Sequence, residues 1–145
     1  MGRNTGIFKT KLSHSAISKR QRKIKNPIRF KAQTWRSMLR FRSKNSNIPF
    51  DENITIDFLE ELLIKTEKCP CCKKNIDLLN KKQRINTSPS IDKLIPDKGY
   101  TVNNISLICW RCNNLKRDSS PSELRMIADW IEKRMKSYNA VLTEW

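Results

Sequence analysis

Apolar residues recur at intervals of three and four in three segments of the chain, which predicts three amphipathic helices. The first is expected to begin at Pro27 and to cover residues 27–44, and the second covers 54–66. The third is expected to begin at a capping box formed by Ser120 and Glu123, with Pro121 in its first position. The expected core positions are Ile28, Ala32, Trp35, Met38 and Leu39 in the first helix, Phe58, Leu59, Leu62 and Leu63 in the second, and Leu124, Ile127, Ile131 and Met135 in the third.

Two shorter apolar segments have no helical period and are typical of strands. SIDKLI at 90–95 and ISLICW at 105–110 have this character, and the second has the apolar density of a buried strand. Between them, PDKGY has the residue types of a turn, with Gly99 in it. Residues 45–53 are expected to form a loop, and a polar linker is expected to reach to about residue 87. This pattern predicts a small α+β fold.

Four of the five cysteines form two CxxC pairs. Cys69 and Cys72 make the first pair, and Cys109 and Cys112 make the second. Four thiolates in two such pairs are the ligand set of a structural zinc ion, which contributes folding energy directly. The 36 residues between Cys72 and Cys109 exceed the spacing of an ordinary zinc ribbon, which is about 15–20 residues. Zinc is therefore expected to clamp the base of a strand–loop–strand unit, with Cys71 left as a spare thiol.

Positive charge is concentrated at the N-terminal end. The chain has 145 residues, with 30 Lys and Arg against 14 Asp and Glu, a net charge of +16. Residues 1–50 carry 14 basic residues and no acidic one, which predicts a basic nucleic-acid-binding arm and helix at 1–50 and a nearly neutral domain at 51–145. A solvated tail or an anionic-membrane patch is the alternative. The expected phosphate contacts are Arg20, Arg22, Lys23, Arg29, Arg36, Arg40, Arg42, Arg111, Lys116 and Arg117.

The N-terminal sequence lacks the apolar core of a signal peptide, and no apolar run approaches the ~20 residues that span a bilayer. We therefore expect a cytoplasmic protein without a membrane partner. In a reducing compartment, cysteines serve as metal ligands rather than as disulfides.

The segment TSPSIDKLIPDKGYTVNNISLICWRCNNLKRD, residues 87–118, resembles the HNH endonucleases of the His-Me finger (ββα-metal) superfamily. It is most similar to zinc-stapled forms from phages and mobile elements. The resemblance covers about residues 69–118 and depends on an ordered set of features. These are a CxxC pair, an Asp-led pair on the first strand, a GYT turn, an Asn-Ile start to the second strand, and CxxCN before a basic helix. It implies a zinc-bound ββα-metal core with flanking helices.

The resemblance also implies a set of site residues. Asp92 and Asn113 match the ligands of a catalytic cation, Mg²⁺ or Mn²⁺, and Asn104 matches the asparagine that braces the loop between the strands. The implied activity is hydrolysis of phosphodiester bonds in DNA, leaving 3′-hydroxyl and 5′-phosphate ends, in the host cytosol if the protein is phage-encoded.

Lys93 departs from the family pattern, because it stands where the family has its general-base histidine. A free lysine has a pKa of ~10.4 and is protonated at neutral pH. Lys93 is therefore a base with a depressed pKa, a phosphate-stabilising cation, or the mark of an inactive site. His14, the only histidine, lies in the arm. Two other functions stay open: a zinc module that only binds DNA or RNA, and a structural or regulatory nucleic-acid-associated phage protein. Branched DNA is a further possible substrate.

Overall fold

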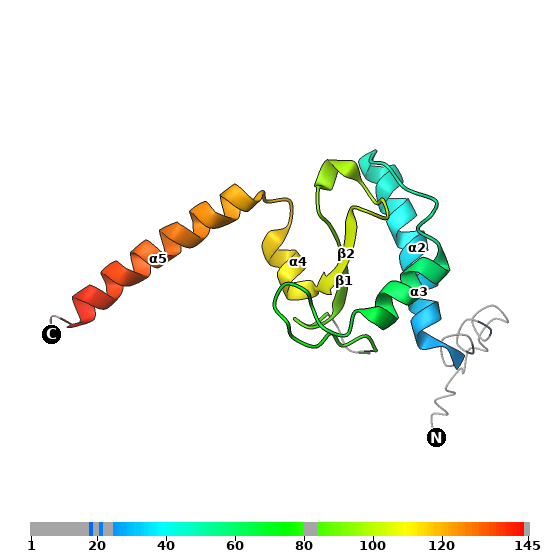
Figure 1. Ribbon diagram of the computed structural model, residues 1–145, viewed down its shortest axis with the longest axis horizontal. Coiled ribbons are helices and arrows are strands. Elements are labelled where there is room, and N and C mark those ends of the chain that lie inside the picture. The colour runs from blue at the N-terminus through cyan, green and yellow to red at the C-terminus, as the bar shows by residue number, and fades with distance from the viewer. Residues whose placement is uncertain (1–17, 19–20, 22–24, 80–83, 144–145) are drawn as a thin grey trace, which may run out of the picture.

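The computed structural model describes residues 18, 21, 25–79 and 84–143, with side chains to residue 139. The elements are α2 (Pro27–Ser46), α3 (Ile56–Lys65), β1 (Pro89–Lys93), the 3-10 helix η1 (Pro96–Lys98), β2 (Ile105–Cys109), α4 (Trp110–Lys116) and α5 (Pro121–Thr143). Helices thus combine with one small antiparallel sheet, the predicted α+β class (Figure 1). Among the described residues, no helix is both long and apolar enough to cross a membrane. Of the residues singled out above, His14, Arg20, Arg22 and Lys23 lie outside the described part.

Helix α2 begins at Pro27, as the sequence predicts. The side chain of Asn26 caps it by accepting a hydrogen bond from the backbone N–H of Arg29 at 3.0 Å. The helix ends at Asn47, whose left-handed backbone (φ 51°) lets its N–H reach carbonyls of the last turn. Helix α3 is capped in the same way by Thr55, which is a common N-cap residue.

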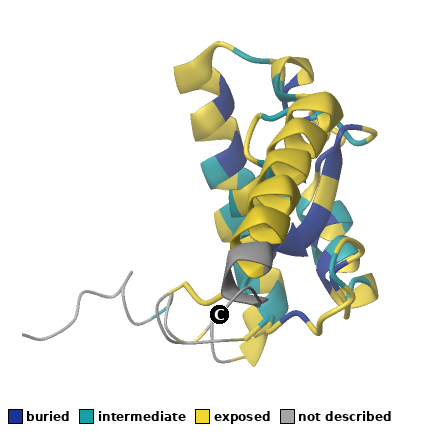
Figure 2. Cartoon of the chain, turned by 90° about the vertical axis from the view of Figure 1, so that its left-hand side faces the viewer, coloured by how far each residue is buried: buried dark blue, intermediate teal, exposed yellow. Residues whose placement is uncertain are grey.

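Helices α2 and α3 pack against each other through the apolar faces that the sequence predicts. Ala32 and Leu39 of α2, together with Leu59 and Leu63 of α3, have no exposed surface. Leu107 of β2 belongs to the same core, so the helix pair and the sheet share one hydrophobic interior (Figure 2). Burying a side chain of this kind is worth about 1.5–3 kcal/mol relative to leaving it exposed.

The sheet is a single antiparallel pair, with Ile91 opposite Leu107 and Lys93 opposite Ile105. Strand β1 ends at Lys93, earlier than the predicted residue 95, because the N–H of Ile95 bonds to a side chain instead of to the partner strand. Strand β2 ends at Cys109, and helix α4 begins at the next residue. Strand, strand and helix therefore follow one another with only the loop 94–104 between the strands.

The loop between the strands is tied to the segment that follows α2. The N–H of Tyr100 donates to the carbonyl of Pro49 at 2.9 Å, and the N–H of Asp51 donates to the carbonyl of Tyr100 at 2.8 Å. Gly99 makes this close approach possible. Its φ is +66°, and a Cβ there would lie 2.2 Å from the Pro49 carbonyl oxygen. Only glycine fits this position without strain.

Helix α5 begins as predicted but does not join the core. Ser120 and Glu123 form the reciprocal capping box, with N–H to side-chain oxygen distances of 2.7 and 3.2 Å. Hydrogen bonds from the Ser120 side chain and backbone lower the pKa of Glu123 below its ordinary value.

The expectation that Leu124, Ile127, Ile131 and Met135 are core residues is wrong, because every residue from 121 to 139 is exposed. The helix extends away from the body (Figure 1), and its residues 121–139 have the exposed colour in Figure 2. An apolar period identifies the face that a helix would bury, but the segment after α4 directs α5 away from the core that the other described elements form.

Candidate metal centre and the neighbouring polar site

The two CxxC pairs meet in space. The Sγ atoms of Cys69, Cys72, Cys109 and Cys112 lie within 4.8 Å of one another, a cluster that could hold a metal ion such as zinc. The first pair lies in a turn closed by the bridge between Lys68 and Asn75. The second spans the end of β2 and the first turn of α4. The cluster therefore joins the 69–75 turn to the point where the sheet becomes a helix.

The geometry of the cluster fits a tetrahedral zinc site. Zinc–sulfur bonds of about 2.3 Å give a tetrahedron whose sulfur–sulfur edges are about 3.8 Å. The Sγ atoms of Cys72 and Cys109 are 3.7 Å apart. All five cysteines are free thiols, and Cys71 is exposed and outside the cluster. The donor set and its spacing match a structural zinc ion, as the sequence predicts.

Backbone N–H groups point at the sulfur atoms. Cys109 N–H donates to Cys69 Sγ at 3.4 Å, and Cys112 N–H donates to Cys109 Sγ at 3.5 Å. Burial opposes ionisation of Cys69, but the N–H groups around it outweigh burial and lower its pKa to about 6. Burial and the neighbouring thiols raise the pKa of Cys112. The four sulfurs cannot all ionise side by side unless a cation shares their charge.

Asn104 links the two ends of the loop between the strands. Its Oδ1 accepts from the N–H of Ile95 at 2.9 Å, and its Nδ2 donates to the carbonyls of Ile95 and Gly99, both at 2.8 Å. The side chain is only 7% exposed, so these bonds are shielded from water. The amide thereby holds the loop in the conformation that follows Lys93.

Helix α4 lies along β1, and Asn113 makes the first contact between them. Its Nδ2 donates to Ser90 Oγ at 2.6 Å and to the carbonyl of Ile91 at 3.1 Å. These two bonds fix the amide so that its nitrogen faces the strand. Among the described residues, no hydrogen bond engages its Oδ1, which leaves an oxygen donor for a ligand.

Lys116 makes the second contact, one helical turn further on. Its Nζ is 3.0 Å from Asp92 Oδ1 and 2.8 Å from the carbonyl of Lys93. The Asp92 side chain is only 9% exposed, so this ion pair is largely removed from water. An ammonium group therefore occupies the position beside Asp92 that a cation would take.

Lys93 does not join these groups. Neighbouring residues of a strand project to opposite faces of the sheet, so Lys93 points away from Asp92. Its Nζ lies 5.2 Å from the centre of the Tyr100 ring, a cation–π contact. The face of an aromatic ring attracts a positive charge.

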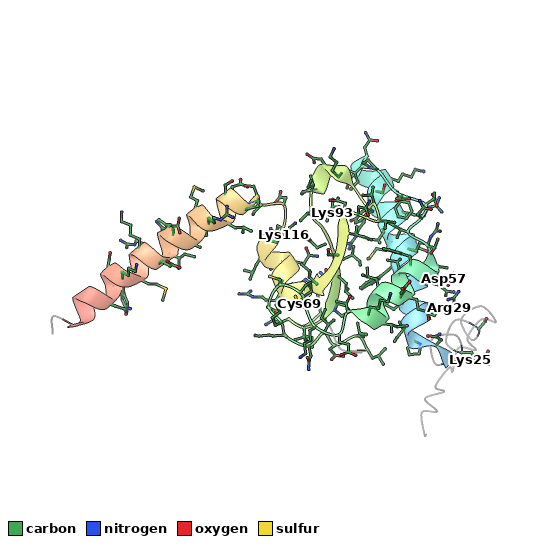
Figure 3. The ribbon with its side chains drawn as sticks, viewed as in Figure 1. Lys25, Arg29, Asp57, Cys69, Lys93 and Lys116 are labelled. Atoms are coloured by element: carbon green, nitrogen blue, oxygen red, sulfur yellow. The ribbon has the colours of Figure 1, made fainter. Side chains whose placement is uncertain are left out.

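The described arginines that the sequence predicts as phosphate contacts divide into two sets. Arg29 pairs with Asp57 at 2.7 Å, and the two side chains are labelled in Figure 3. Arg36 and Arg40 pair with Glu52 at 2.8 and 2.9 Å. Arg36 also donates to the carbonyl of Ile54 at 2.9 Å, so these three arginines help to attach α2 to the segment 51–60. Arg42, Arg111 and Arg117 are exposed. In the sequence, only the acidic residues after position 50 indicated that some of these arginines would form ion pairs within the protein.

Comparisons of the chain with protein-family models, with curated proteins and with solved structures found no match in any of the three.

Proposed function

We propose that this protein is a metal-dependent endonuclease of the HNH type that hydrolyses phosphodiester bonds in DNA. The observation that supports the proposal is the pairing of β1 with α4. Asp92 on the strand and Asn113 on the helix both lie where these two elements meet, directly after the cysteine cluster. The sequence resemblance in residues 69–118 gives the same two positions the role of metal ligands.

Asp92 and Asn113 fit a hard divalent cation such as Mg²⁺ or Mn²⁺. One supplies a carboxylate, and the other supplies the amide oxygen that its bonds to Ser90 and Ile91 leave available. When bound, such an ion stabilises the negative charge that develops on the phosphate and on the leaving oxygen. Lys116, now paired with Asp92, would have to release the carboxylate, and its ammonium group would then be available to the phosphate.

Lys93 is assigned as a cation for another phosphate of the bound strand, because its side chain points away from Asp92. Of the three roles open to it, this one is supported by the Tyr100 ring beneath its ammonium group, which favours positive charge. Asn104 holds the loop that begins after Lys93 and so orients the end of the strand. In this proposal Asp92 and Asn113 are the oxygen ligands and Lys93 and Lys116 are cations for phosphate. Asn104 braces the loop between the strands.

Plasmid nicking tests the proposal. Supercoiled plasmid is incubated with the zinc-loaded protein and Mg²⁺, Mn²⁺ or no added divalent ion, beside Asp92→Ala and the exposed control Asp97→Ala. We expect metal-dependent nicking that Asp92→Ala abolishes and Asp97→Ala retains. Lys93→His is expected to be no faster than wild type, because the side chain at this position points away from Asp92. Nicking that survives Asp92→Ala at the wild-type rate would overturn the proposal.

A second function, a zinc module that binds nucleic acid without cutting it, is supported by the ion pair between Asp92 and Lys116. A carboxylate that already has an internal partner needs no metal to be satisfied. This function predicts binding without cleavage under every metal, and Asp92→Ala would leave the affinity unchanged.

A further inference from the structure

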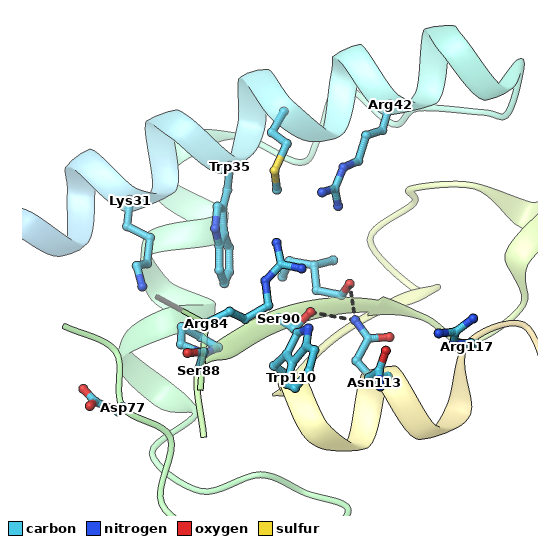
Figure 4. Close-up of a pocket in the computed structure, with 14 residues that line it drawn as sticks. Lys31, Trp35, Arg42, Asp77, Arg84, Ser88, Ser90, Trp110, Asn113 and Arg117 are labelled. Carbon is cyan, nitrogen blue, oxygen red and sulfur yellow. Dashed lines mark hydrogen bonds between the residues drawn. The ribbon is translucent and has the colours of Figure 1, made fainter. Parts of the chain in front are cut away.

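A cleft of about 490 Å³ opens between α2 and the corner formed by β1 and α4. Two tryptophans face it, Trp35 from α2 and Trp110 from the start of α4, on opposite sides in Figure 4. Asn113 also lines the cleft, so it borders the proposed metal site. The sequence indicated no hollow here, because its walls come from segments far apart in the chain.

The cleft is strongly cationic. Lys31, Arg42, Arg84 and Arg117 line it, against a single carboxylate, Asp77. Unlike the α2 arginines that pair with the 51–60 segment, Arg42, Arg84 and Arg117 form no ion pair within the part of the chain that the structure describes. Positive side chains gathered around a hollow repel one another and destabilise the fold, unless an anion is their partner.

The indole rings add a second requirement for the ligand. Both tryptophans are half-buried, so part of each ring is open to the cleft. Aromatic side chains in a cationic groove are the arrangement by which proteins bind single strands, since each base can stack on a ring while the phosphates meet the cations. In a duplex both faces of a base are covered by neighbouring pairs, so only an unpaired nucleotide can use the rings. The volume is that of a small-ligand pocket.

We propose that this cleft binds an unpaired nucleotide of a nucleic-acid strand, with its base against Trp35 and Trp110 and its phosphates against Arg42, Arg84 and Arg117. The inference rests on the proposed nuclease function and names its substrate: a single-stranded or branched nucleic acid whose unpaired segment enters beside Asn113. The ligand has both an anionic backbone and a planar base, and each part is tested separately.

Fluorescence anisotropy with the full-length, zinc-loaded protein tests the phosphate contacts. Binding is measured without Mg²⁺ or Mn²⁺, so that no cleavage occurs, to a labelled oligothymidylate and to a duplex of equal length. The double variant Arg42→Ala/Arg84→Ala is compared with Arg125→Ala/Arg134→Ala, which removes the same charge from exposed positions on α5. We expect the cleft variant to weaken single-strand binding about tenfold more than the control pair does, and duplex binding equally with it.

An abasic oligonucleotide tests the stacking. Wild type is expected to bind the normal strand at least about fivefold more tightly than an abasic strand of the same length. Trp110→Leu should remove this difference, whereas Trp130→Leu on α5 should retain it, with circular dichroism and zinc content confirming that both variants fold. Equal affinity of the wild type for the two strands would overturn the inference, as would equal losses in the two arginine pairs.

The result separates this inference from the proposed function. Asp97→Ala, the exposed control of the nicking assay, is included in the same binding assay, and we expect it to bind like wild type. A protein that nicks plasmid but shows no preference for unpaired bases would remain a nuclease without this subsite. A protein that binds unpaired nucleotides in the cleft but never cuts would keep the subsite and lose the nuclease.

Discussion

Replacing Asn104 with alanine should destabilise the protein by about 2–4 kcal/mol. The side chain makes three hydrogen bonds of 2.8–2.9 Å to the backbone of Ile95 and Gly99. A typical bond of this kind contributes about 0.5–1.5 kcal/mol, and a buried carbonyl left without a donor costs about 1–3 kcal/mol. Ile95 is half exposed, so water can replace the amide there, but Gly99 is buried and its carbonyl would stay unpaired. The upper half of the expected destabilisation therefore comes from the Gly99 carbonyl, which loses its donor in a buried place.

Urea denaturation in a buffer with a fixed excess of free zinc measures this effect, because bound metal contributes to the apparent stability. Asn103→Ala is the matched control, since its side chain is exposed and makes no hydrogen bond within the described residues. The midpoint should fall for Asn104→Ala with an unchanged slope, whereas Asn103→Ala should stay within about 0.5 kcal/mol of wild type. Equal stability of the two variants would refute the bracing role of Asn104.

Three further perturbations test other parts of the fold. Gly99→Ala should cost about 2–4 kcal/mol in urea denaturation, from positive-φ strain and overpacking, because its Cβ would meet the Pro49 carbonyl oxygen at 2.2 Å; wild-type stability would contradict this. A strong chelator, or Cys109→Ser, should lower zinc content and abolish the cooperative thermal transition, whereas Cys71→Ser should change neither. Ending the chain at residue 120 should change the free energy of unfolding by less than about 0.5 kcal/mol, because residues 121–139 are exposed; a large loss would show that α5 does pack on the body.

Local signals in the sequence were sufficient for the elements and for the cysteine cluster. The start of α2 at Pro27 and the capping box at Ser120 are determined within one helical turn, so they can be found without knowing the rest of the fold. Each cysteine pair is also recognisable from its short spacing alone. One metal ion bound by all four cysteines then requires the two pairs to lie close together. The apolar faces of α2 and α3 were also predictable, because the two helices follow one another along the chain and pack together.

Contacts between distant segments were not predictable in the same way. The pairing of Arg36 and Arg40 with Glu52 depends on how α2 turns into α3, and it removes residues from the expected phosphate-binding face. The exposure of α5 depends on the direction of the chain after Arg117, whose backbone has a positive φ of 47°. The spacing of apolar residues in the sequence does not indicate the direction in which the chain continues after a turn.

The order of residues around Cys112 explains how the metal cluster and the polar site depend on each other. Cys109 ends β2 and Cys112 lies in the first turn of α4, so a metal bound by both fixes the angle at which the helix leaves the strand. Asn113 and Lys116 reach β1 only at that angle, because their bonds run to Ser90 and to Asp92 on the neighbouring strand. Losing zinc should therefore disorganise the polar site together with the core that the cysteines share. Asn113 directly follows Cys112 because the same turn of α4 places the cysteine in the metal cluster and the asparagine against β1.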